Sequence, residues 1–179
     1  MAPPSLVWID CEMTGLSATD KLIEIAVLIT DDDLNIVEEG PSLIIRQPKE
    51  VMDNMNEWCV KHHGESGLTA AVLASNVSTD EACSQVLTFV KKHIPQAGRG
   101  ILAGNSVHAD KVFLDREMRS LMDHLHYRIV DVSTVKELAR RWFPKEFADV
   151  PPKQGAHRAL DDIKESITEL KYYRRAIFL

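Results

Sequence analysis

The stretch Leu6-Val7-Trp8-Ile9-Asp10-Cys11-Glu12 places two acids directly after four apolar residues. The apolar run is typical of a buried β-strand, and the breakers Thr14 and Gly15 follow it. Residues two apart on a strand point to the same side, so Asp10 and Glu12 are expected to face one cleft. Strand geometry places their Cα atoms roughly 7 Å apart. An isolated Asp-x-Glu is more often a polar strand end than a catalytic site, so further residues must carry the functional argument.

Apolar runs along the rest of the chain predict the other strands of a sheet. The expected strands lie at 6–9, 23–29, 35–45, 101–103 and 127–130. The run at 23–29 is nearly continuous, which is typical of a strand buried on both faces. Gly40-Pro41 is expected to bend or bulge the third strand.

Helices are expected between and after these strands. They are placed over 49–93 with a break at His63-Gly64, over about 110–122, over 133–142 and over about 158–175. Ser78 or Thr79 is expected to cap the last helix before residue 93, and Pro144 to end the helix over 133–142. Three strands in a meander, followed by strand–helix alternation, indicate an α/β fold in which a mixed five-stranded sheet carries helices on both faces.

Composition restricts the class of protein. The chain has 179 residues, 45% of them apolar, which predicts a single domain over 1–179. Lys and Arg total 21 against 27 Asp and Glu, and this net charge of −6 argues against a long nucleic-acid track. A metal-dependent phosphoesterase stays open, because bound cations reverse the local field. No apolar run approaches the roughly 20 residues of a membrane helix, so no membrane association is expected.

The cysteines and the first residues indicate a compartment. Cys11, Cys59 and Cys83 are odd in number and widely spaced, which predicts neither a disulfide framework nor a zinc site. The first five residues carry no charged flank, so no secretory signal and no Arg-rich transit peptide is expected there. We therefore expect a cytoplasmic protein, or a mitochondrial one if a presequence has been trimmed.

Asp110 strengthens the case for an acidic site. It precedes Phe113 and Leu114 by three and four residues in the expected helix, so it shares their core-facing side. A buried carboxylate is costly unless a cation or a hydrogen-bond donor compensates it. The alternative is a plain helix N-cap. Asp115 competes for the same role, but it is expected to point toward solvent.

The segment His157-Arg158-Ala159-Leu160-Asp161-Asp162 supplies a histidine and two more acids. If the last helix begins near Arg158, His157 lies in the preceding loop and can reach over a site at the helix N-terminus. Asp161 and Asp162 both lie off the apolar stripe, so periodicity does not choose between them. A charged first turn that favours the helix dipole is the simpler explanation of this pair.

Together these residues predict a chemistry. Four carboxylates, two from a strand end and one from each of two later helices, can hold two divalent cations roughly 4 Å apart. Oxygen ligands favour Mg²⁺ or Mn²⁺ over zinc. A histidine with an ordinary pKa near ~6.5 suits the general base that deprotonates an attacking water.

The order Asp10-x-Glu12, Asp110, and His157 with four residues before Asp162 resembles the DEDDh exonucleases of the ribonuclease H-like superfamily. Five more particular blocks resemble the oligoribonuclease branch of that family. They are WIDCEMTGL at 8–16, SGL at 66–68, AGNS at 103–106, YRIVDVST at 127–134 and HRALDD at 157–162. The family spacing selects Asp162 over Asp161.

The resemblance implies a ribonuclease H-like fold and a homodimeric 3′-to-5′ exoribonuclease. Its substrate would be short single-stranded RNA, dinucleotides above all, cut to mononucleotides with two Mg²⁺ or Mn²⁺ ions. His157 would be the base, and Asp10, Glu12, Asp110 and Asp162 would hold the metals. The acidic net charge agrees, because a two-nucleotide substrate needs a pocket rather than a basic track.

The resemblance also implies substrate contacts outside the acids. Leu16 would wedge between the two bases, Trp58 and His63 would line the base and sugar pocket, and Tyr127 would reach in from the partner subunit. The 5′-phosphate would be held by Ser106, Arg128, Ser133 and Lys136.

Each of these contacts has a simpler alternative. Leu16 would pack in an ordinary turn, and Trp58 would be a core residue. His62 or His63 would be a simple surface residue. An N-cap at Ser133 or Thr134, completed by Glu137 as a capping box, would explain the start of the helix over 133–142.

Two other functions compete with the exoribonuclease. A DNA-directed proofreading exonuclease would use the same four carboxylates and differ in contacts to a 2′-hydroxyl. A non-catalytic RNA-binding protein on a nuclease fold is the third possibility. It is disfavoured because all five catalytic residues are present.

Overall fold

The computed structural model describes residues 5–152 and 158–178, and its centre is a five-stranded sheet in the order β3-β2-β1-β4-β5. The strands are β1 (Leu6–Met13), β2 (Leu22–Thr30), β3 (Ile36–Ile44), β4 (Ile101–Gly104) and β5 (Ile129–Asp131). β1, β2 and β3 form an antiparallel meander, while β4 runs parallel to β1 and β5 parallel to β4. This mixed sheet confirms the predicted α/β fold.

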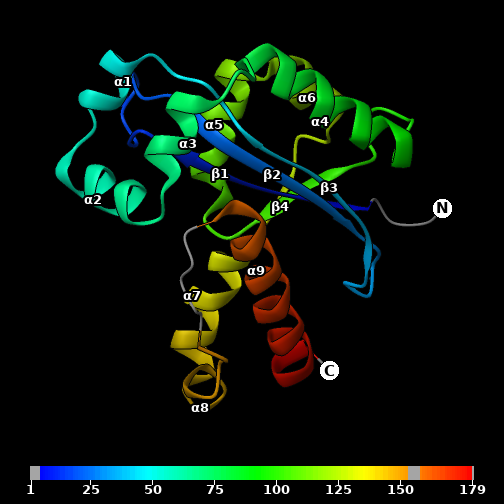
Figure 1. Cartoon of the computed structure of the whole chain (residues 1–179). Coiled ribbons are helices and arrows are strands. Elements are labelled where there is room, and N and C mark those ends of the chain that lie inside the picture. The colour runs from blue at the N-terminus through cyan, green and yellow to red at the C-terminus, as the bar shows by residue number, and fades with distance from the viewer. Residues whose placement is uncertain (1–4, 153–157, 179) are drawn as a thin grey trace.

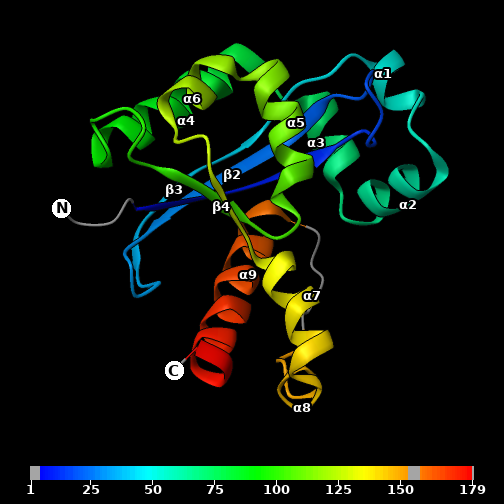
Figure 2. The ribbon, with the colours of Figure 1, turned by 180° about the vertical axis from the view of Figure 1, so that it is seen from behind.

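Helices cover both faces of the sheet (Figure 1; Figure 2, seen from behind). They are α1 (Lys49–Asp53), α2 (Glu57–Glu65), α3 (Leu68–Ala74), α4 (Thr79–His93), α5 (Val107–Glu117), α6 (Arg119–His124), α7 (Val132–Trp142), α8 (Pro144–Ala148) and α9 (Ala159–Tyr173), and one π-helical turn (Arg174–Phe178) follows. In both views α4, α5 and α6 lie above the sheet, and α7, α8 and α9 lie below it. Among the described residues, none of these helices is long and apolar enough to cross a bilayer.

The alternation of side chains along β1 decides which face carries the acids. Val7 and Ile9 belong to the core that packs against α4, α5 and α6. Trp8, between them, packs in the second core with α7 and α9. Asp10 and Glu12 continue the alternation of Trp8, so they emerge on the side where α9 crosses the sheet.

A third, smaller core holds α1, α2 and α3 at one end of the sheet. Met52, Cys59 and Leu68 pack there against Ile23 of β2. This arm lies beside the end of β1 (Figure 1). It therefore brings α2 next to the two acids that end that strand.

Several expected boundaries are wrong, and each has a local cause. β1 continues through the acids to Met13, paired with β2. The helix expected over 110–122 breaks at Met118, whose backbone leaves the helical region with φ −132° and ψ 47°. The break expected at His63-Gly64 falls at Gly67, which takes φ +76°, a conformation that favours glycine.

The structure also tests the predicted helix ends at Pro144 and Ser78 and the predicted bulge at Gly40-Pro41. Pro144 opens α8 as well as ending α7, because proline suits the first turn of a helix. Ser78 caps α4 by accepting a hydrogen bond from the Glu81 N–H, as predicted. The pairing of β2 with β3 slips at Gly40-Pro41, which confirms the bulge. Cys11, Cys59 and Cys83 are free and buried.

Candidate active site

Three of the predicted acids meet at the end of β1. Asp10, Glu12 and Asp162 each offer a carboxylate oxygen, and these oxygens lie within 4.8 Å of one another. Asp162 comes from the first turn of α9, and Asp161 beside it points to solvent. The geometry therefore selects Asp162, the residue that the family spacing selected.

Asp110 completes the cluster from α5. It lines the same cavity of about 280 Å³ as the other three acids. Its Oδ1 accepts a hydrogen bond from the Cys11 N–H at 3.0 Å, so the carboxylate is tied to the strand between Asp10 and Glu12. The N-cap alternative is wrong, because the cap position of α5 is Ser106. Asp115 pairs with Lys111 on the outside of the helix.

Burial and mutual repulsion shape the electrostatics of this cluster. Desolvation by burial is the largest cause that raises the pKa of Asp10 well above its usual range, and Asp110, Asp162 and Glu12 raise it further. The pKa of Glu12 rises to about 8, first by burial and then through Asp162. Burial raises the pKa of Asp110 to about 7. Acids held this close need compensating positive charge, and a set of carboxylate oxygens suits a divalent cation.

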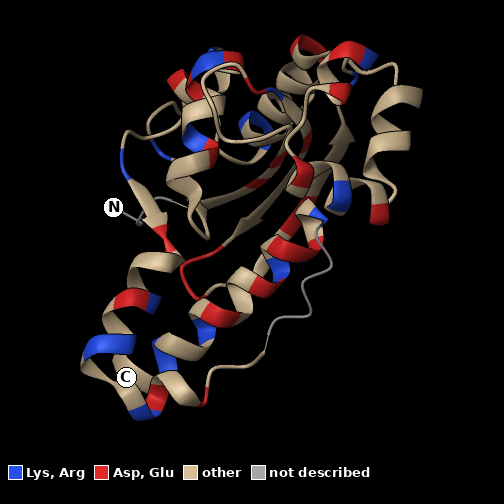
Figure 3. Cartoon of the chain, turned by 90° about the vertical axis from the view of Figure 1, so that its left-hand side faces the viewer, with Lys and Arg blue, Asp and Glu red and all other residues tan. Residues whose placement is uncertain are grey.

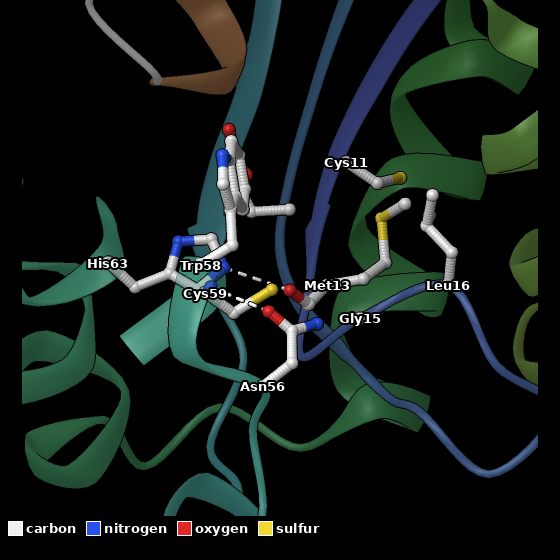
Figure 4. A pocket seen from close by; sticks show the side chains of 9 residues that line it. Cys11, Met13, Gly15, Leu16, Asn56, Trp58, Cys59 and His63 are labelled. Atoms are coloured by element: carbon white, nitrogen blue, oxygen red, sulfur yellow. Dashed lines mark hydrogen bonds between the residues drawn. The ribbon is translucent and has the colours of Figure 1, made fainter. Parts of the chain in front are cut away.

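A second, largely apolar pocket of about 430 Å³ adjoins the acids, and both cavities share Cys11, Glu12 and Met13. Trp58 and His63 of α2 lie on one side of the view in Figure 4, and Leu16 lies on the other. Leu16 is 75% exposed and Trp58 57% exposed, so turn packing and core packing do not explain them.

The two histidines of α2 have different positions. His63 is buried, and its Nε2 donates to the Met13 carbonyl at 2.9 Å, which anchors the pocket wall to the end of β1 (Figure 4). His62 stacks on Trp58 with ring centroids 3.9 Å apart. His63 is therefore the histidine that lines the pocket, and His62 supports the Trp58 ring.

The loop that carries Leu16 is held by one carboxylate. Asp20 Oδ1 accepts from the Thr14 hydroxyl at 2.8 Å, and its Oδ2 accepts from the Ser17 N–H at 2.7 Å. These bonds close the turn around Gly15, where any Cβ would lie only 2.6 Å from Asp20 Oδ2. The exposed Leu16 side chain is thus presented by a fixed loop.

Two of the expected phosphate contacts, Ser106 and Ser133, meet around Asp131. Asp131 Oδ1 accepts from the Ser106 N–H at 2.8 Å and from the Ser133 N–H at 3.0 Å. His108 Nδ1 lies 3.1 Å from the other oxygen. Asp131 is the N-cap of α7, so the expected cap at Ser133 or Thr134 is wrong. Glu137, the expected partner in a capping box, pairs with Arg140 and Arg141 instead.

The remaining expected contacts lie in two places. The Arg128 guanidinium lies 5.6 Å from the centre of the Tyr127 ring, and Tyr127 is 77% exposed. Lys136 Nζ lies 3.6 Å from Glu169, a buried acid that also accepts from Asn105. His157 lies outside the described residues.

Sequence reasoning missed two acids near the site. Asp131 organises the ends of β4 and β5, and Glu24 forms an ion pair with Arg158. Glu24 carried a visible signal, since it is the lone charge in the otherwise apolar run from Leu22 to Ile29.

Comparisons with known proteins identify the family of the chain. Residues 7–170 match the exonuclease family RNase_T. The chain belongs to this exonuclease family.

Within the family, its relatives include oligoribonucleases. The mitochondrial oligoribonuclease of Mus musculus is 58% identical over 174 residues, which cover 97% of this chain and 73% of that protein. The oligoribonuclease of Pseudoalteromonas translucida is 52% identical over 175 residues, covering 97% and 96%. The chain is thus a member of the oligoribonuclease branch.

The fold extends to more distant exonucleases. E. coli exonuclease I in complex with a dA16 oligonucleotide superposes with a TM-score of 0.71 at 14% identity. The match covers 97% of this chain and 41% of that one. This likeness confirms the ribonuclease H-like exonuclease fold.

Proposed function

We propose that this protein hydrolyses short single-stranded RNA from the 3′ end, dinucleotides above all, with two Mg²⁺ or Mn²⁺ ions, and that 1–179 works as one exonuclease domain. The supporting observation is that the acid cluster opens into one apolar pocket of about 430 Å³. This size is typical of small-molecule sites, roughly 300–1,000 Å³. In the view of Figure 3, Lys and Arg alternate with Asp and Glu along the helices that face the viewer. Such a surface suits a substrate of very few nucleotides.

Each residue of the cluster then has a role in phosphodiester hydrolysis. Asp10, Glu12, Asp110 and Asp162 hold the cations, which, when bound, lower the pKa of water and stabilise negative charge at the scissile phosphate. His157 takes the proton of the attacking water as general base. Leu16 separates the two bases, while Trp58 and His63 line the base and sugar pocket.

The 5′ end of the substrate is assigned to the region around Asp131. Arg128 supplies a planar fork for two charge-assisted bonds to a terminal phosphate. Ser106 and Ser133 lie at helix starts, and Lys136 adds charge from α7. A terminal 5′-phosphate bears more charge than a bridging one, so this group favours an RNA whose 5′ end lies a fixed distance from the metals.

The active form is proposed to be a homodimer. Tyr127 is 77% exposed, and Trp142 on α7 is 65% exposed. β5 is an edge strand of the sheet and immediately precedes α7. Tyr127 lies two residues before this edge strand, and a large exposed side chain at a strand edge is typical of a protein interface. Tyr127 would complete the pocket of the partner subunit.

The cellular compartment of the protein is proposed only from that of its relatives. The relative from Mus musculus is named mitochondrial, whereas the bacterial relatives work in cells without that organelle. We place the protein in the cytosol or in mitochondria, where short RNA fragments arise.

The decisive experiment compares substrates. A labelled diribonucleotide, a heptaribonucleotide and the matching deoxyribonucleotides are incubated with the protein in Mn²⁺, with and without EDTA. We expect the diribonucleotide to disappear fastest and EDTA to stop all cleavage. Faster loss of the heptamer would contradict the preference for dinucleotides. Equal loss of DNA would favour the DNA-directed alternative, and no cleavage at all would favour a binding protein.

A further inference from the structure

We propose that Glu24 and Arg158 form a positioning pair that sets Asp162 opposite Glu12 and so sets the geometry of the metal site. Neither side chain is among the metal-holding acids or the substrate contacts. The proposal rests on the proposed metal-dependent function. It concerns how the chain holds two of the four acids in place.

Glu24 is a buried acid in a strand that has no other charge. Every residue of β2 is buried, and Glu24 is 1% exposed. Its Oε1 accepts from Arg158 Nη2 at 3.0 Å and from Nε at 3.2 Å. Its Oε2 is buried and has no hydrogen-bond partner among the described residues. A carboxylate in this setting costs folding free energy, whereas an apolar residue would not.

Arg158 connects that carboxylate to the first turn of α9. It is the N-cap residue, with an extended backbone at φ −129° and ψ 124°. Its carbonyl accepts the N–H groups of Asp161 and Asp162, both at 3.0 Å. The side chain of Arg158 therefore binds β2 while its main chain starts the helical turn that carries Asp162.

These contacts close a ring around the acid cluster. Glu12 pairs in register with Glu24 across β1 and β2. Glu24 binds the Arg158 side chain, and the Arg158 carbonyl binds Asp162. Asp162 returns to Glu12, because their carboxylate oxygens lie within 4.8 Å. The ion pair thus links the strand neighbour of Glu12 to the helical turn that carries Asp162.

A structural role alone and a positioning role predict different results for a double substitution. Removing one partner leaves a buried charge unpaired and destabilises the fold, so single variants are ambiguous. Replacing both partners by apolar residues of similar size is often neutral for stability. It also leaves the net charge beside Glu12 unchanged. The pair Glu24→Leu with Arg158→Met therefore separates stability from positioning.

The matched control uses another ion pair between α9 and the sheet. Lys164 of α9 binds Glu39 of β3 at 3.0 Å, and both side chains are exposed. The double variant Glu39→Gln with Lys164→Met removes this tether without touching the ring. We expect it to behave as the parent protein in every assay.

The experiment measures Mn²⁺ affinity by calorimetry, melting temperature in EDTA, and kcat and KM on a diribonucleotide. We expect the Glu24→Leu, Arg158→Met protein to melt near the parent, bind Mn²⁺ about 10-fold more weakly, and lose about 10- to 100-fold in kcat with KM unchanged. Arg158→Lys keeps the charge but not the planar guanidinium. Its Mn²⁺ affinity and kcat are expected to lie between those of the parent and the double variant, and it serves as the test if the double variant does not fold.

Parental Mn²⁺ affinity and kcat in the double variant would overturn the proposal, as would equal losses in the control pair. Parental values for Arg158→Lys together with an unfolded double variant would also overturn it, since the pair would then serve stability alone. The Mn²⁺ titration needs no substrate, so it tests this pair even if the parent protein cleaves no RNA.

Discussion

The Ser133 hydroxyl donates to Asp131 Oδ1 at 2.6 Å, the same oxygen that accepts the Ser133 N–H. A serine hydroxyl has one proton, so while this bond persists Ser133 offers an incoming phosphate only lone pairs. The pKa of Asp131 is lowered despite partial burial, through hydrogen bonds from Ser133 and His108. Asp131 is therefore an anion at the helix end expected to receive the 5′-phosphate.

This arrangement ranks the two 5′-phosphate contacts. Arg128→Ala should weaken the binding of a 5′-phosphorylated dinucleotide about 10- to 100-fold, because charged hydrogen bonds are worth roughly 1.5–3 kcal/mol each. Ser133→Ala should weaken it by less, because its proton is already committed to Asp131. Dissociation constants measured in an Asp162→Asn background, which removes turnover, test this order. A larger loss for Ser133→Ala would show that Asp131 releases the hydroxyl when phosphate binds.

The preference for short RNA should depend on Arg128. A longer RNA must carry its extra 5′ nucleotides past Arg128 and lose the terminal phosphate bonds. Arg128→Ala should therefore weaken binding of the dinucleotide far more than that of a heptanucleotide, and remove most of the advantage of a 5′-phosphate over a 5′-hydroxyl. Titrations of both lengths, with and without the phosphate, give the answer. Losses by the same factor would make Arg128 a general phosphate contact.

Local sequence patterns predicted the strands and the acid pair well. The alternation Val7, Trp8, Ile9 puts Asp10 and Glu12 on one side of β1 by strand geometry alone. The cap at Asp131 was missed because Ser133 and Thr134 also suit a helix start. Asp131 also binds Ser106 and His108, which lie more than 20 residues away in the sequence and carry no local signal.

The tertiary contacts of the site were beyond the sequence pattern. Periodicity could not choose Asp162, because its selection depends on how α9 crosses the end of β1. The Glu24–Arg158 pair joins residues 134 positions apart. Methionine is not a helix-breaking residue, so the sequence does not predict the break at Met118. The break depends on the packing of α5 and α6 in the core.

Each metal-holding acid should be essential for activity but not for folding. We expect Asp10→Asn, Glu12→Gln, Asp110→Asn and Asp162→Asn each to lower kcat by about 10²-fold or more, through several kcal/mol of lost transition-state stabilisation. Asn at 110 retains an oxygen for the Cys11 N–H, so the fold should survive. Turnover at saturating Mn²⁺ measures the activity of each variant, and circular dichroism measures its folding. Near-normal turnover in one variant would remove that residue from the metal site.

The raised carboxyl pKa values predict an unusual pH dependence of stability without metal. The pKa of Glu12 rises from 4.5 to about 8 and that of Asp110 from 3.8 to about 7. At pH values between the unfolded-state pKa and the folded-state pKa of each group, the folded protein binds more protons than the unfolded chain. Its stability therefore falls as pH rises through this range. In EDTA the melting temperature should decrease from about pH 5 to pH 8, and Mn²⁺ should remove the decrease. Glu12→Gln should flatten the curve, and a melting temperature that rises over this range would refute the electrostatic picture.

If Tyr127 completes the pocket of the partner, two inactive variants should restore each other. A Tyr127→Ala subunit keeps its own acids, and an Asp162→Asn subunit keeps its tyrosine. In a two-fold dimer that pairs them, the site with intact acids also receives an intact Tyr127. Random exchange of equal amounts makes about half of the dimers mixed, with one complete site each, so about a quarter of the parental activity should return.

Activity after denaturation and joint refolding is compared with that of each variant refolded alone. Sedimentation of the parent protein at assay concentration should show the dimer. A fully active monomer, or no recovery in joint refolding of variants that still dimerise, would place Tyr127 outside the neighbouring site.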